Sequence, residues 1–114
     1  MPILKDNPSL SDLQVYQDAL CKERGWDKSD DLEVFLLFSE EIGELAKAIR
    51  NKKSLYIEKG KEKPNAQQEL EAEFADVLGY LLELANHFGV DLNQAFRAKE
   101  EINAQREWKD NSAS

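Results

Sequence analysis

The sequence predicts an all-α fold, a single four-helix bundle-like domain, and three observations support this prediction. Apolar residues recur at helical spacing in four segments, and glycine, proline and capping residues separate these segments. No segment shows the alternation of apolar and polar residues, bounded by turn residues, that is typical of strands. A length of 114 residues fits one domain, residues 1–114, with its own hydrophobic core.

The first helix should follow an arm without regular structure, residues 1–8. Ser9 or Ser11 can cap this helix, because a side-chain oxygen at that position accepts a hydrogen bond from a free backbone N–H. Gly25 should end it, since glycine adopts the left-handed conformation of a helix C-terminus without steric cost.

The second helix should begin at a capping box that Asp30 forms with Glu33 and should run to about Arg50. A polar loop that is rich in lysine follows over residues 51–65. We interpret it either as a solvated linker or as a cover for bound phosphates.

The last two helices have equally clear ends. Pro64 is a favourable first-turn residue for the third helix, and Gly89 marks its end. Asp91 should cap the fourth helix, which is expected to reach about Trp108. Residues 109–114 should form a frayed tail.

Two of the predicted helices carry a second apolar stripe, which faces away from the first. A stripe this wide exceeds what one small core requires, so it predicts a homo-oligomer, either a homodimer or a homotetramer. The alternative is that these leucines are incidental surface residues. The residues of the stripe are Leu32, Leu36, Leu78 and Leu82.

Composition and charge exclude several classes of protein. The formal net charge of −8 argues against a general nucleic-acid-binding surface. Cys21 is the single cysteine, so neither an intrachain disulfide nor a cysteine-based zinc site is possible, and a reducing compartment fits best. The chain has no apolar signal region and no run long enough to span a membrane. These features predict a cytoplasmic protein without a membrane partner.

An acidic pair lies inside the apolar run of the second helix. At about 100° per residue, Glu41 points in the direction of the apolar arc, Glu44 lies at its edge, and the adjacent Glu40 lies outside it. The apolar residues of this arc are Val34, Leu37, Leu45 and Ala48.

The third helix repeats this arrangement with Glu73, which lies in line with the apolar residues, and Asp76, which flanks them. Carboxylates are rarely buried without a partner, so two helices that turn acids toward one core need a cation between them. Oxygen ligands without sulfur or imidazole favour Mg²⁺ or Mn²⁺. Two alternatives stay open, an ordinary solvated acidic face and pairing with lysine or arginine across the bundle.

The fourth helix supplies complementary charge. Lys99, Asn103 and Arg106 are spaced i, i+4 and i+7, on a face that also carries apolar residues, so this face is expected to look inward. These side chains could pair with the acids. If metal ions neutralise the acids, the cations are free to hold phosphate oxygens, which indicates a polyphosphate substrate.

The acidic motifs resemble a known family. Glu40-Glu41-x-x-Glu44 followed by Glu73-x-x-Asp76 is similar to the E-E-x-x-E and E-x-x-D motifs of the MazG-type all-α nucleotide pyrophosphohydrolases. The resemblance extends over most of the chain and is strongest to the short, single-domain, dCTP pyrophosphatase-like branch. It implies Mg²⁺-dependent hydrolysis of a nucleoside triphosphate to its monophosphate and pyrophosphate, in a homo-oligomer.

The resemblance also implies roles for individual residues. The metal ligands would be Glu41, Glu44, Glu73 and Asp76. Glu40 would orient or deprotonate the attacking water or complete a second metal shell. The side chains that would contact substrate are Trp26, Tyr80, Lys99, Asn103 and Arg106.

Some interpretations stay open alongside the resemblance. Trp26 could instead be an aromatic plug between helix ends. Asn51 stands where that branch has a second tryptophan at the base pocket, so the base preference does not carry over. The alternatives to an enzyme are a nucleotide- or metal-binding regulatory protein without turnover and a helical interaction module.

Overall fold

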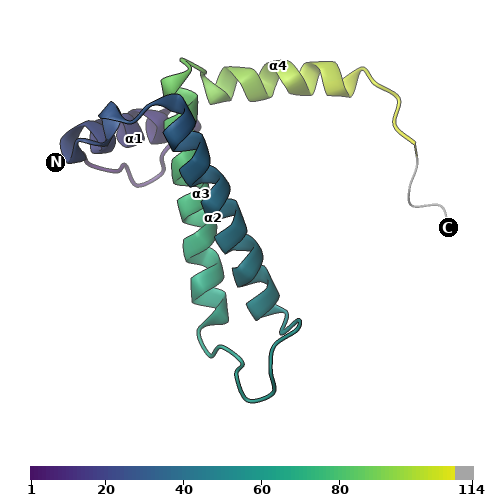
Figure 1. Cartoon of the computed structure of the whole chain (residues 1–114). Helices are drawn as coiled ribbons and strands as arrows, with labels where there is room; N and C mark the ends of the chain where they lie inside the picture. Colours follow the sequence, from purple (N-terminus) through teal and green to yellow (C-terminus); the bar gives the residue numbers. More distant parts are fainter. Residues whose placement is uncertain (110–114) are drawn as a thin grey trace.

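A computed structural model describes residues 1–109, which form four α-helices and one 3₁₀ turn, with no strand in that part of the chain (Figure 1). The prediction of an all-α fold with four main helices is therefore confirmed. The elements are α1 (Leu10–Arg24), η1 (Trp26–Lys28), α2 (Asp31–Lys52), α3 (Ala66–His87) and α4 (Leu92–Ala104).

The helix ends follow the local sequence signals. Ser9 caps α1 and forms a reciprocal capping box with Asp12. Gly25 ends α1 with φ 74°, a left-handed conformation that glycine adopts readily. The side chain of Asp30 accepts a hydrogen bond from the backbone N–H of Glu33 at 2.8 Å at the start of α2, and Asp91 caps α4 in the same way. The helix α3 begins at Ala66, two residues after Pro64.

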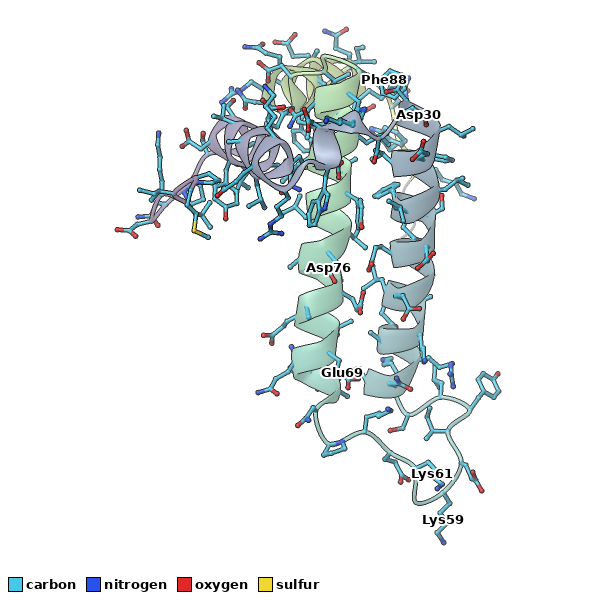
Figure 2. All side chains as sticks on the ribbon, turned by 60° about the vertical axis from the view of Figure 1, so that its left-hand side comes forward. Asp30, Lys59, Lys61, Glu69, Asp76 and Phe88 are labelled. Atoms are coloured by element: carbon cyan, nitrogen blue, oxygen red, sulfur yellow. The ribbon has the colours of Figure 1, made fainter. Side chains whose placement is uncertain are left out.

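The helices α2 and α3 form a long antiparallel hairpin, and the loop at residues 53–65 joins them (Figure 1). The helix α1 packs against α3 near the opposite end of this hairpin. At that end Nδ1 of His87 lies 3.0 Å from Oδ1 of Asp31, which ties the last turn of α3 to the first turn of α2. Figure 2 shows Lys59 and Lys61 at the tip of the loop. The buried apolar residues of the core are Cys21, Val34, Ala48, Leu82 and Ala85.

A network of side-chain amides joins three helices. Nε2 of Gln14 donates hydrogen bonds to Oδ1 of Asn86 at 3.1 Å and to the carbonyl oxygen of Val90 at 2.8 Å. Its Oε1 accepts a hydrogen bond from the backbone N–H of Leu92 at 2.9 Å. Asn86 donates in return to the carbonyl oxygen of Gln14 at 2.9 Å. Since every polar atom of the buried Gln14 amide is bonded, α1 fixes both the end of α3 and the start of α4.

The fourth helix does not return to the hairpin. Its main packing partner is α1, and it extends sideways from the top of the hairpin in Figure 1. Phe96 is 69% exposed and Ile102 is 52% exposed, so the expectation that this face looks inward is wrong for the single chain. The helix also ends at Ala104, earlier than expected. Trp108 lies beyond that end, and its Nε1 donates a hydrogen bond to the carbonyl oxygen of Asn103 at 3.1 Å.

The chain is more open than a compact monomer of its size. Its radius of gyration is 17.9 Å, whereas about 13 Å is expected for a compact domain of this length. It exposes 9016 Å², compared with roughly 6,400 Å² for a typical monomer of this mass. Among residues 1–109, no helix has the length and apolar character needed to cross a membrane. The predicted frayed tail lies outside the described residues except for Lys109.

Candidate active site

The α2–α3 hairpin brings three carboxylates together. Glu41 comes from α2, and Glu73 and Asp76 come from α3. One carboxylate oxygen from each lies within 4.8 Å of the other two. The i, i+3 spacing places Glu73 and Asp76 on one side of α3, and the antiparallel packing presents Glu41 to that side. Figure 2 shows Asp76 about midway along α3.

Among residues 1–109 these carboxylates have no protein counter-charge. Oε2 of Glu41 and Oε2 of Glu73 are buried and accept no hydrogen bond. No salt bridge in residues 1–109 involves Glu41, Glu73 or Asp76, so the alternative of pairing with lysine or arginine fails within this part of the chain. Buried carboxylate oxygens without partners are costly, and a bound cation is one group that could neutralise them.

The pKa of Glu41 reflects these surroundings. Burial is the main cause that raises its pKa from 4.5 to about 7. A side-chain hydrogen bond with Glu73 and the negative charge of Glu73 add to this rise, and the charges of Asp76 and Glu44 raise the pKa further. Without a cation, therefore, the cluster holds a proton near neutral pH.

The donor set fits a divalent hard cation. Oxygen ligands on opposite sides of a Mg²⁺ ion are about 4.2 Å apart, given bond lengths of about 2.1 Å. The oxygens of Glu41, Glu73 and Asp76 lie within 4.8 Å of one another, which is close to that value. All the donors are carboxylates, which suit Mg²⁺ and Mn²⁺ better than softer metals.

A cavity of about 430 Å³ opens beside this cluster, in the size range of small-molecule sites. Residues from α1, η1, α2 and α3 line it. Glu41 and Asp76 contribute to its wall, together with Trp26 and Tyr80. The structure thus brings two of the predicted substrate-binding residues into one cavity with two of the predicted metal ligands.

The two aromatic residues have different environments. Trp26 is 47% exposed, and the Arg24 guanidinium lies 4.9 Å from the centre of its ring. Burial, and then the charge of Glu41, raises the pKa of Tyr80 above 10.0. Glu83, Asp76 and Glu40 add smaller contributions to this rise. Tyr80 therefore keeps its proton at neutral pH and can donate a hydrogen bond.

Glu44 faces a second cavity, of about 330 Å³, that lies nearer the loop. Glu73 lines this cavity too, so the acidic cluster lies at the boundary between the two cavities. Lys47 and Lys63 also line the second cavity. Sequence reasoning did not single out Lys47, although it lies one turn beyond Glu44. It included Lys63 only among the many lysines of the loop.

The remaining predicted residues lie apart from the cluster. Glu40 is exposed on α2, and Lys99 and Arg106 are exposed on or just beyond α4. The Arg106 guanidinium lies 6.0 Å from the centre of the Trp108 ring. Oδ1 of Asn103 is buried without a hydrogen-bond partner. Because α4 extends away from the hairpin, the chain does not bring Lys99, Asn103 and Arg106 to its own acids.

The residues of the larger cavity that sequence reasoning missed include Glu83 on α3 and Gln17 on α1. Glu83 is only 7% exposed. Its position seven residues after Asp76, two helical turns along the same face, was the signal that could have identified it. Gln17 gave no such signal, because its place in the cavity depends on how α1 packs against α3.

Known proteins provide a further comparison. The family model described as the MazG nucleotide pyrophosphohydrolase domain matches residues 31–106. The chain is 30% identical over 100 residues to the uncharacterized protein YvdC of Bacillus subtilis (strain 168), a match that covers 81% of this chain and 90% of that protein. It is 32% identical over 100 residues to dCTP pyrophosphatase 1 of Mus musculus, a match that covers 87% of this chain and 59% of the mouse protein. The chain belongs to the MazG nucleotide pyrophosphohydrolase family, and it is a nucleoside triphosphate pyrophosphohydrolase.

Proposed function

We propose that the protein hydrolyses (deoxy)nucleoside triphosphates to nucleoside monophosphate and pyrophosphate with Mg²⁺, for which Mn²⁺ can substitute. The observation that carries this proposal is the group formed by Glu41, Glu73 and Asp76. Their oxygens converge without a cation from the described part of the chain, beside a cavity of the size of a small-molecule site.

The ion would be held by Glu41, Glu73 and Asp76, with Glu44 as a further ligand from the side of the second cavity. A bound Mg²⁺ supplies charge neutralisation at the phosphates and acidifies a bound water. The protein's own contribution is mostly position, since phosphoryl transfer requires alignment and electrostatic stabilisation more than covalent chemistry.

The reaction is attack of a water oxygen on the α-phosphorus. The new bond is that P–O bond, and the bond from the α-phosphorus to the bridging oxygen of the β-phosphate breaks. Glu40 and Glu41 are the candidates to orient the water and accept its proton. The charge of Glu40 contributes to the raised pKa of Tyr80, which supports a place for Glu40 near the edge of the larger cavity.

The two cavities are suited to hold different parts of the substrate. The nucleoside would lie in the larger cavity, where Trp26 can stack on the base and Tyr80 can donate a hydrogen bond. Stacking of this kind contributes roughly 1–3 kcal/mol per base. The departing pyrophosphate would lie toward Lys47 and Lys63 in the second cavity.

We also propose that the protein acts as a homodimer or homotetramer. The open shape, the excess of exposed surface and the bare apolar face of α4 support assembly. Leu32, Leu36 and Leu78 of the predicted stripe are exposed, whereas Leu82 is buried in the core. In an assembly Lys99, Asn103 and Arg106 would reach the phosphates of a neighbouring copy.

The relative from mouse, which is named a dCTP pyrophosphatase, supports a deoxynucleotide substrate. A role in removing or controlling nucleotides of the cellular pool follows from such an activity.

The proposal is tested by incubating the purified protein with a panel of ribo- and deoxynucleoside triphosphates. Pyrophosphate and monophosphate are measured with Mg²⁺, with Mn²⁺ and with EDTA. We expect equimolar monophosphate and pyrophosphate with either metal, and neither product with EDTA. Binding of triphosphate and metal without pyrophosphate release would instead establish the alternative, a regulatory protein without turnover. Release of inorganic phosphate would contradict attack at the α-phosphorus.

A further inference from the structure

Glu83 is a buried acid that the proposed hydrolysis does not use. Its residue is only 7% exposed, yet it lines the larger cavity. No nitrogen or oxygen donor in residues 1–109 forms a hydrogen bond or an ion pair with its carboxylate. The Cys21 thiol, a weak donor, hydrogen-bonds to this carboxylate. A buried carboxylate whose neighbour is so weak a donor is poorly stabilised, so a stronger donor from outside the chain would complete its hydrogen bonding.

The neighbours of Glu83 do not neutralise it. Burial, and then the charge of Glu83, raises the pKa of the Cys21 thiol to about 11, so the thiol stays uncharged. Arg24 also lines the cavity, but its guanidinium lies over the Trp26 ring and forms no salt bridge among the described residues. Gln17 offers an amide whose Nε2 lies 3.7 Å from Sγ of Cys21, a weak acceptor.

The position of Glu83 fits the base end of a nucleotide. It lies seven residues beyond Asp76 on α3, about 10 Å along the helix axis at 1.5 Å per residue. With the α-phosphate at the acidic cluster, the base would lie toward Glu83, beside the exposed ring of Trp26. Gln17 lines the same cavity from α1, the helix that packs against α3.

We infer that Glu83, together with Gln17, selects bases that carry an exocyclic amino group next to a ring nitrogen, as cytosine and adenine do. This inference rests on the proposed function, because it places a nucleotide in the cavity. Glu83 accepts a hydrogen bond from the amino group, and the Gln17 amide donates one to the ring nitrogen.

The chemistry of the two side chains supports this selection. An ionised carboxylate only accepts hydrogen bonds, whereas a carboxamide both donates and accepts. Uracil, thymine and hypoxanthine present a carbonyl oxygen where cytosine and adenine present an amino group. That oxygen would face the Glu83 carboxylate, and no hydrogen bond could form because both groups are acceptors. Sites that leave buried polar groups unpaired with the wrong substrate discriminate strongly against it.

Two substrate pairs test the inference, dCTP with dUTP and ATP with ITP, since the members of each pair differ in the amino group or carbonyl oxygen and in whether the adjacent ring nitrogen accepts or donates a hydrogen bond. We expect the wild-type kcat/KM to be at least about tenfold higher for the amino-bearing member of a pair that is accepted. In Glu83→Gln, whose amide can both donate and accept, the preference should fall to within about threefold. Glu71→Gln, at an exposed acid on the same helix, should keep the wild-type preference.

Binding of the monophosphates dCMP and dUMP, measured by calorimetry, gives a readout that does not depend on turnover. We expect dCMP to bind more tightly to the wild type and the two Kd values to converge in Glu83→Gln. If this variant does not fold, Gln17→Leu should weaken the same preference. Equal affinity of the wild type for both, tighter binding of dUMP, or binding of neither would overturn the inference. Selective binding of dCMP without any pyrophosphate release would refute the proposed hydrolysis and leave base selection standing.

Discussion

The α2–α3 hairpin and α4 both place charged side chains among apolar ones at helical spacing, but they differ in what the chain packs against them. In the hairpin, Glu41 on α2 meets Glu73 and Asp76 on α3, and their carboxylates converge. In α4, Lys99 is exposed and Phe96 is 69% exposed, because the hairpin lies elsewhere. A helical pattern identifies a face that needs a partner, and the tertiary contacts decide whether the same chain provides it.

The largest effect should come from the hairpin acids. Glu41→Gln or Asp76→Asn should lower kcat/KM by at least about 100-fold, the scale for loss of a group that stabilises transition-state charge. The measurement is pyrophosphate release with Mg²⁺. The fold should survive, because neither carboxylate forms an ion pair in the described chain. Full activity in either variant would remove that residue from the site, and Glu71→Gln serves as the matched control on α3.

Charged substitutions in the exposed apolar face of α4 test whether this helix packs against a second copy of the chain. Phe96→Asp or Ile102→Asp should shift the protein toward monomer and reduce turnover by about tenfold, since a charge in an apolar interface is costly. Sedimentation equilibrium and the pyrophosphate assay measure the two effects. Metal binding to the hairpin should persist in both variants. A wild-type protein that is monomeric and fully active would show that α4 needs no second copy.

A smaller effect is expected in the second cavity. Lys63→Ala should raise the KM for a nucleoside triphosphate several-fold, because an exposed lysine contributes modestly to phosphate binding. Lys59→Ala, at the tip of the same loop in Figure 2, is the control and should leave KM unchanged. If the two substitutions raised KM equally, the overall positive charge of the loop, and not the position of Lys63, would explain the effect.

The smallest effect is the pH dependence of stability without metal. The folded protein holds a proton on Glu41 up to about pH 7, whereas the unfolded chain releases it near 4.5. The unfolded state therefore binds fewer protons in this range, and the contribution of Glu41 to stability is lost as the pH rises from about 4.5 through 7. Urea unfolding in EDTA across this range measures it. Glu41→Gln should flatten the slope, and an unchanged slope would contradict the pKa assignment.

The sequence predicts the hairpin site better than the position of α4. The spacing within Glu73-x-x-Asp76 is a local property of one helix, so periodicity places both acids on one side. The direction of α4 depends on the hydrogen bond from the backbone N–H of Leu92 to Oε1 of Gln14, 78 residues apart, and no periodicity reports such a contact. Glu83 was missed for a related reason, since it has no acidic partner three residues away and lies within an apolar run.

The central claim is that a divalent cation neutralises Glu41, Glu73 and Asp76, and the thermal stability of the purified protein with and without Mg²⁺ tests it most directly. At about 100 times the Kd, binding to the folded state adds about 2.7 kcal/mol and should raise Tm by roughly 10 °C. Glu73→Gln should lose most of this shift, whereas Glu71→Gln should retain it. A wild-type Tm that does not respond to millimolar Mg²⁺ or Mn²⁺ would contradict the claim.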